Sequence, residues 1–234
     1  METSQNNISN ELLNLIDESE EFLKSQQIIY GEDIFLDFDA ALLSLPPQER
    51  KRKVLADLFY RVRKCQNCAL AAKRKHMVFG SGNAETEIMV IGEAPGFYED
   101  QKGLPFVGEA GKLLDKILAA IDLSRDNLFI TNVLKCRPPE NRDPDINEKS
   151  ACFPILVEQI KIIKPKFILI LGRIAAHSLL NMDGSLTALR NKVYDIYDAK
   201  ALVTYHPAAL LRDASKKRET WQDVQLFQKL IKEA

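Results

Sequence analysis

The stretch Ile88-Met89-Val90-Ile91-Gly92-Glu93-Ala94-Pro95-Gly96 sets the pattern for the rest of the chain. Four apolar residues in a row, followed at once by a turn of glycine and proline, are typical of a strand buried on both faces. Three further short apolar runs share this character, at residues 128–133, 167–171 and 201–204. Because helical patterns separate the runs, we predict an open α/β fold with a mainly four-stranded parallel sheet and helices on both faces.

The helical patterns lie over residues 47–64, 110–121, 146–163, 174–180 and 220–232. The first is basic and carries one apolar stripe. Residues 1–50 read as an acidic N-terminal helix followed by a turn-rich linker, and residues 51–234 read as the main folded domain. The leader helix could bind a protein partner, cover a basic face of the domain, or cap the fold.

Composition limits the class of protein. The 234 residues are 46% hydrophobic and 28% charged, which excludes a wholly disordered chain, a collagen and a small disulfide-stapled protein. No apolar run reaches the roughly 18–20 residues that a membrane helix needs. The first residues also lack the basic and apolar regions of a signal peptide. We therefore expect a cytoplasmic protein with no membrane association.

The net charge of −1 hides an asymmetry between the leader and the rest of the chain. Residues 1–50 hold 11 acidic and 2 basic side chains, and residues 51–234 hold 22 acidic and 30 basic ones, giving net charges of −9 and +8. A basic body favours a polyanionic partner such as nucleic acid. A solvated surface with a charged tail would account for the same charges.

Polar residues gather where the predicted strands end. Gly92 to Gly96 follow the first strand, Asn132 closes the second and His206 follows the fourth. The carboxyl ends of parallel strands meet at one edge of a sheet, where ligands bind in such folds. The sequence therefore predicts one site built from distant segments.

Each candidate residue at that edge has an alternative, structural role. Glu93 and Glu99 offer carboxylates, although loop carboxylates are often merely solvated. Asn132 can donate to and accept from one edge of a base, or cap a turn. Phe106 could stack on a base or pack in the core. His206 could donate a proton or stabilise an oxyanion, or be structural. The glycine turn itself is neither a phosphate-binding Walker loop nor a dinucleotide fingerprint.

The four cysteines form a second candidate site. Cys65 and Cys68 are spaced to place two thiolates on one metal, and Cys136 and Cys152 follow 67 and 15 residues later. Four thiolates suit either zinc or an iron–sulfur cluster, and the spacing does not distinguish them. The simpler alternative to a metal site is that two of the cysteines are ordinary buried thiols and that the Cys-x2-Cys spacing is a coincidence. Disulfides are disfavoured in a reducing cytosol.

Taken together and in order, these segments resemble the family 4 uracil-DNA glycosylases, the iron–sulfur branch of that superfamily, over about residues 65–225. The matching segments are Cys65-x2-Cys68, Gly92-Glu93-Ala94-Pro95-Gly96-x2-Glu99-Asp100, Gly103-x-Pro105-Phe106-Val107-Gly108-x-Ala110-Gly111, Thr131-Asn132-x2-Lys135-Cys136-Arg137-Pro138-Pro139, Cys152 and His206-Pro207-Ala208-Ala209-Leu210-Leu211-Arg212.

The resemblance implies an activity and a set of site residues. The activity is excision of uracil from single- or double-stranded DNA, which leaves an abasic site during base excision repair. The uracil-binding residues would be Glu93, Ala94, Phe106, Asn132 and His206. The catalytic residues would be Glu99, His206 and Glu93. Glu99 is the preferred carboxylate for orienting the attacking water. Its alternative role is to screen the pocket against the methyl group of thymine. The DNA contacts would be Leu210, Leu211 and Arg212, although we expect at least one leucine to anchor its loop in the core.

The resemblance also implies a [4Fe-4S] cluster on Cys65, Cys68, Cys136 and Cys152, with a structural role. We expect a monomer. Asn191 stands where many relatives have glycine, and the leader lies outside the match. Related branches that capture DNA covalently carry a Glu-Gln-Pro loop, whereas this chain has Ala94 there. Two other functions stay open: a DNA-binding module without catalysis, and a glycosylase for another damaged base.

Overall fold

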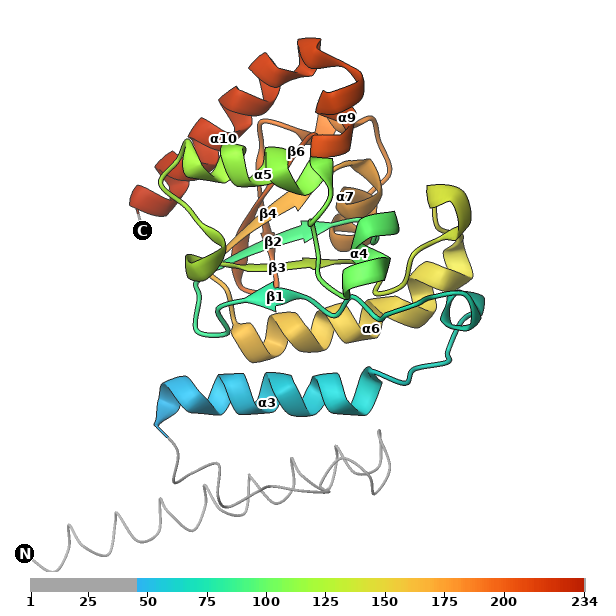
Figure 1. Cartoon of the computed structure of the whole chain (residues 1–234). Coiled ribbons are helices and arrows are strands. Elements are labelled where there is room, and N and C mark those ends of the chain that lie inside the picture. The colour runs from blue at the N-terminus through green and yellow to red at the C-terminus, as the bar shows by residue number, and fades with distance from the viewer. Residues whose placement is uncertain (1–45, 234) are drawn as a thin grey trace, which may run out of the picture. The chain divides into compact units, whose positions relative to one another are not determined.

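The computed structural model describes residues 46–233, and the described residues from Pro47 onward belong to one compact unit (Figure 1). The predicted acidic helix and most of the linker lie outside the described residues. No helix within residues 46–233 is both long enough and apolar enough to span a bilayer.

The centre of the unit is a six-stranded sheet with the order β1-β3-β2-β4-β6-β5. The four predicted strands are its parallel core, and nearly all their residues are buried, as continuous apolar runs require. Their bounds are Ile88–Gly92 for β2, Phe129–Asn132 for β3, Phe167–Leu171 for β4 and Ala199–Thr204 for β6. The predicted α/β fold is confirmed.

Two antiparallel edge strands were not predicted. Strand β1 (Ser81–Gly82) has two residues, too few to make a pattern. Strand β5 (Val193–Ile196) has four residues and is half-exposed, and it pairs with β6 through a tight turn. Tyr197 and Asp198 both have positive φ in that turn. Such turns are usually recognised in a sequence by an Asn-Gly pair, which is absent here.

Within the part of the chain that the structure describes, five long helices and three short ones surround the sheet. The five predicted helices are present as α3 (Pro47–Val62), α5 (Glu109–Ala119), α6 (Ile146–Ile163), α7 (Arg173–Leu180) and α10 (Lys217–Lys232). Helices shorter than two turns carry no periodicity, so α4 (Phe97–Lys102), α8 (Leu186–Leu189) and α9 (Pro207–Arg212) were missed. Single 3₁₀ turns lie at Ala69–Ala72, Arg125–Asn127, Pro139–Asn141 and Ala214–Lys216.

The winding of the chain places the candidate site. Helices α5 and α10 cover one face of the sheet, and α6 and α7 cover the other, with α3 packed outside α6 (Figure 1). After β2 the chain passes through α5 to β3 on one side, and then through α6 to β4 on the other side of β2. This reversal leaves a crevice at the carboxyl ends of the strands, where α/β folds bind ligands.

Candidate functional site

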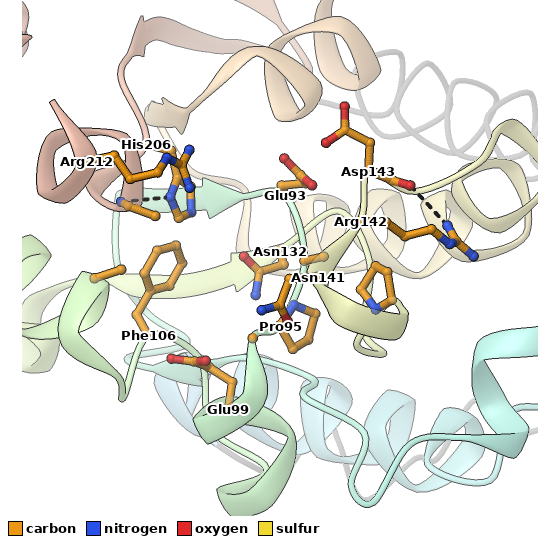
Figure 2. A pocket seen from close by; sticks show the side chains of 15 residues that line it. Glu93, Pro95, Glu99, Phe106, Asn132, Asn141, Arg142, Asp143, His206 and Arg212 are labelled. Carbon is orange, nitrogen blue, oxygen red and sulfur yellow. Dashed lines mark hydrogen bonds between the residues drawn. The ribbon is translucent and has the colours of Figure 1, made fainter.

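A pocket of about 310 Å³ lies at the carboxyl ends of β2, β3 and β6 (Figure 2). Residues predicted from four separate segments of the chain all line it, namely Glu93, Ala94, Glu99, Phe106, Asn132, His206 and Arg212. The volume is at the lower end of the range for small-ligand sites. The predicted convergence of distant segments is therefore present in the structure.

Asn132, the last residue of β3, is fixed at the floor of the pocket and is only 1% exposed. Its Oδ1 is buried without a hydrogen-bond partner within residues 46–233. Gly92 stands beside it in β2, and a Cβ there would lie 2.5 Å from that oxygen and 2.6 Å from Cζ of Phe106. Glycine at residue 92 thus keeps the pocket open, and the unpartnered acceptor is available to a ligand donor.

Glu99 anchors the loop that carries Phe106. Its Oε1 accepts hydrogen bonds from the backbone N–H groups of Val107 at 2.8 Å and Gly108 at 2.9 Å. The Phe106 ring faces the His206 ring with centroids 5.5 Å apart and planes inclined by 30° (Figure 2). The carboxylate of Glu99 therefore acts as part of the pocket wall.

The opposite side of the same loop is held by Arg125. Its guanidinium donates to the backbone oxygens of Pro105 and Phe106, and it pairs with Asp115. Phe106 has a positive φ of 53°, which costs a non-glycine residue conformational energy. Gly111 makes room for this turn, because a Cβ there would lie 1.8 Å from the carbonyl oxygen of Phe106. The ring is held in place from both sides.

His206 is set up as a neutral hydrogen-bond donor. It is the N-cap of α9, and its Nδ1 accepts from the backbone N–H of Ala208 at 3.1 Å. Accepting at Nδ1 leaves the proton of the neutral ring on Nε2. Burial, assisted by the charge of Arg212, lowers the pKa of His206 to about 4. The imidazole is therefore uncharged at neutral pH.

Glu93 is a carboxylate with a strongly altered proton affinity. Burial and then the nearby charge of Asp143 raise the pKa of Glu93 to about 7, against the opposing charges of Arg173, Lys149 and Arg212. A pKa near the working pH is the range in which a side chain can accept and release a proton during a reaction.

The sequence reasoning missed one wall of the pocket. Asn141, Arg142 and Asp143 line it from the loop before α6, and none of the three is among the predicted site residues. Arg142 donates to both oxygens of the buried Glu148 at 2.9 and 2.6 Å, which lowers the pKa of Glu148. Glu148 also completes a capping box with Asp145 at the start of α6. That Asp-x-x-Glu spacing could have been recognised in the sequence as a helix start that fixes the preceding loop.

The predicted DNA contact at Leu210 needs correction. Leu210 is 2% exposed and packs in the core, because it lies on the inner side of α9. Leu211 is 54% exposed, and Arg212 lines the pocket. Only Leu211 of the two leucines can contact a partner, which agrees with the expectation that at least one of them anchors the loop.

Comparison with known proteins identifies the family. The model of the Uracil DNA glycosylase superfamily matches residues 79–225, which is more than half of the chain. The chain belongs to the uracil DNA glycosylase superfamily. A protein described as a type-4 uracil-DNA glycosylase from Saccharolobus solfataricus is 52% identical over 159 residues, covering 64% of this chain and 74% of that protein.

Two further relatives in the superfamily have the same description and are covered over most of their length. The one from Pyrobaculum aerophilum is 41% identical over 174 residues, covering 71% of this chain and 89% of the relative. The one from Thermotoga maritima is 40% identical over 178 residues, covering 74% of this chain and 92% of the relative.

In this superfamily member the four cysteines are free thiols on segments that meet beside α6. Burial raises the pKa of Cys136, the hydrogen bond and charge of Arg74 oppose that shift, and the charges of Cys68 and Cys65 add to it. N–H groups point at three of them: Arg74 Nη1 to Cys136 Sγ at 3.2 Å, the Lys135 backbone to Cys152 Sγ at 3.2 Å, and the Asn67 backbone to Cys65 Sγ at 3.5 Å.

A buried lysine connects the cysteines with the pocket. Lys135 is fully buried, and its amine donates to Thr131 Oγ1 at 2.7 Å, to the Asn132 carbonyl at 2.6 Å and to Gln159 Oε1 at 2.7 Å. These bonds hold the end of β3 that carries Asn132. The next residue along the chain is Cys136, so the two sites share one short, braced segment.

The protonation state of His206 can be measured directly. We expect its ring to stay neutral, with the proton on Nε2, as the pH falls from 8 to about 5, and to gain a second proton near pH 4. Arg212→Ala should move this transition to higher pH, because a neighbouring cation no longer opposes protonation. Nitrogen NMR of the labelled imidazole reports both tautomer and charge. A transition near pH 6.5 in the wild-type protein would contradict the assignment.

Proposed function

We propose that this chain hydrolyses the N-glycosidic bond of deoxyuridine in DNA, releasing uracil and leaving an abasic site for base excision repair. The observation that carries this function is the meeting of Asn132, Phe106 and His206 in one pocket, with a buried acceptor on Asn132. The type-4 uracil-DNA glycosylases at 40–52% identity support the same conclusion.

Recognition of uracil follows from the chemistry of the pocket. The uracil nucleotide must leave the duplex first, because the bond cannot be reached inside the stack. Phe106 then stacks on the base, and Oδ1 of Asn132 accepts from its N3–H. Cytosine has a lone pair at N3, so the same oxygen would face it without a proton between them. A buried polar group left unpaired gives strong discrimination against such an analogue.

Bond cleavage leaves negative charge on the departing uracil and positive charge on the sugar. We assign the first charge to His206, whose neutral Nε2–H donates to O2 of the base as that oxygen becomes anionic. Backbone groups at Glu93 and Ala94 complete the binding of the base. A neutral donor suits this step, since it need not give up its proton.

For the water, the hydrogen bonds favour Glu93 over Glu99. Glu99 holds the backbone of Val107 and Gly108 through one oxygen, which suits a wall that limits the size of the base. Glu93 has its pKa raised to about 7 and lies beside Asp143 in the pocket. We propose that Glu93 orients water towards the sugar carbon and stabilises the cationic sugar.

For DNA binding, Leu211 and Arg212 stand at the rim, followed by Lys216, Lys217 and Arg218 along the chain. We propose that Leu211 fills the space vacated in the stack and that the cations neutralise phosphates, which makes binding salt-dependent. We also propose that the chain acts as a monomer in the cytoplasm, where reducing conditions disfavour disulfides between its cysteines.

For the cofactor, we propose a [4Fe-4S] cluster on Cys65, Cys68, Cys136 and Cys152. Donors aimed at three sulfurs fit thiolate ligands that carry negative charge. Within residues 46–233, no three His, Cys, Asp or Glu side chains come close enough to hold a single metal ion. Four cysteine thiolates are the usual ligand set of such a cluster. When bound, the cluster would cross-link the Cys65–Cys68 loop that follows α3, the segment after β3, and α6.

The excision assay tests the function. We expect the wild-type protein to convert a uracil-containing oligonucleotide into an alkali-labile product without magnesium, and mass spectrometry to identify the released base as uracil. Asn132→Ala should reduce kcat/KM by roughly 10- to 100-fold, since one buried hydrogen bond to the base is lost. Binding without base release would instead indicate a DNA-binding module, and release of another base would indicate a different glycosylase.

The pH dependence tests the role of Glu93. The ionised carboxylate is the active form, so kcat should rise about tenfold per pH unit below pH 7 and level off above it. Glu93→Gln should lower kcat by roughly 10²- to 10⁴-fold and remove this rise. Glu99→Gln is the comparison, since it changes the wall and should keep the rise. A rise that survives in Glu93→Gln would reject the assignment.

Metal analysis tests the cluster. Protein purified without oxygen should be brown and contain iron and sulfide in equal amounts. Cys136→Ser should lose both and unfold at a lower temperature, because the link between α6 and the β3 segment is broken. A colourless wild-type protein with one zinc per chain would overturn the cluster.

A further inference from the structure

Two large aromatic side chains stand exposed at the edge of the pocket, on α4. Phe97 is 50% exposed and Tyr98 is 57% exposed, and their rings meet edge to face with centroids 5.5 Å apart. They lie between Gly96 and Glu99, which both line the pocket. Neither ring has been assigned a role above in binding uracil, in positioning water or in holding the cluster.

The inner side of α4 is fixed to the rest of the fold. Glu99 binds the Phe106 loop, and the buried Asp100 accepts from the backbone N–H groups of Lys75 and His76 at 2.9 and 3.4 Å. A helix of six residues held at two consecutive positions cannot turn its outer rings inward. The exposure of Phe97 and Tyr98 is therefore built into the fold.

Both rings are also connected to the pocket wall. The Arg137 guanidinium lies 5.2 Å from the centroid of Phe97, and its Nε donates to Oδ1 of the pocket residue Asn141 at 2.8 Å. Tyr98 lies against Gly108, where a Cβ would come within 3.2 Å of its ring. Phe97, Tyr98 and Arg137 thus form a rigid ledge, called here the aromatic ledge.

We propose that the aromatic ledge stacks the base next to the extruded uracil in the same DNA strand; this rests on the proposed function. Extrusion removes one stacking partner from that neighbouring base, at a cost of a few kcal/mol. An aromatic face at the mouth of the pocket restores the contact, and the cation of Arg137 suits a polyanionic strand. Stacking tolerates any base, so the ledge would hold the strand without selecting its sequence.

The test uses single-stranded oligonucleotides with one uracil and with either the 5′ or the 3′ neighbour replaced by an abasic tetrahydrofuran nucleotide. For the wild-type protein, one of the two replacements should raise KM and the Kd by roughly 5- to 100-fold and leave kcat within twofold. Phe97→Leu and Tyr98→Leu should raise both constants on intact DNA and respond less to that replacement. Tyr98→Phe should behave as the wild type, since it keeps the π-face.

Tyr60→Leu is the matched control. Tyr60 is 60% exposed on α3 and lies under the Arg63 guanidinium at 5.0 Å, so it copies the chemistry of the ledge away from the pocket. We expect unchanged constants. The proposal is overturned if the leucine variants stay within twofold of the wild type, if they keep its full response to the missing base, or if they only lower the unfolding temperature and kcat. A wild-type protein that releases no uracil would reject the proposed function, and the Kd series would still decide the ledge.

Discussion

The site depends on one close approach between two neighbouring strands. The parallel register of β2 and β3 sets Gly92 beside Asn132, and the space that a side chain would fill at residue 92 is shared by Asn132 and Phe106. With that space open, an amide from the sheet and a ring from the following loop face the same cavity. The strained turn at Phe106 then needs Glu99 and Arg125 on either side to hold the ring.

The sequence predicted the parts of the fold that have strong periodicity. Four continuous apolar runs became the parallel core, and five amphipathic patterns became the long helices. The pocket was predictable because strand ends must meet in a doubly wound sheet, so Asn132 and His206 could be brought together across 74 residues of chain. The edge strands and the short helices carried too few residues to make a pattern.

Other details depend on side-chain contacts that no sequence pattern encodes. Leu210 and Leu211 are identical in type, and only the packing of α9 decides that one is buried and the other exposed. Glu93 and Glu99 likewise look alike in the sequence. Two backbone N–H groups make Glu99 a wall, whereas burial beside Asp143 keeps Glu93 close to its titration point. The part of the pocket wall that Arg142 forms could not be predicted from the sequence for the same reason, since the position of Arg142 comes from its ion pair with Glu148.

The segment from Thr131 to Cys136 holds the pocket-lining amide of Asn132, the buried amine of Lys135 and the thiol of Cys136 within six consecutive residues. A residue inserted or deleted between Asn132 and Cys136 would shift the amide and the thiol relative to each other. The two sites are therefore expected to be inherited as one cassette. An engineer who grafts this pocket onto another scaffold has to transplant the thiol segment with it.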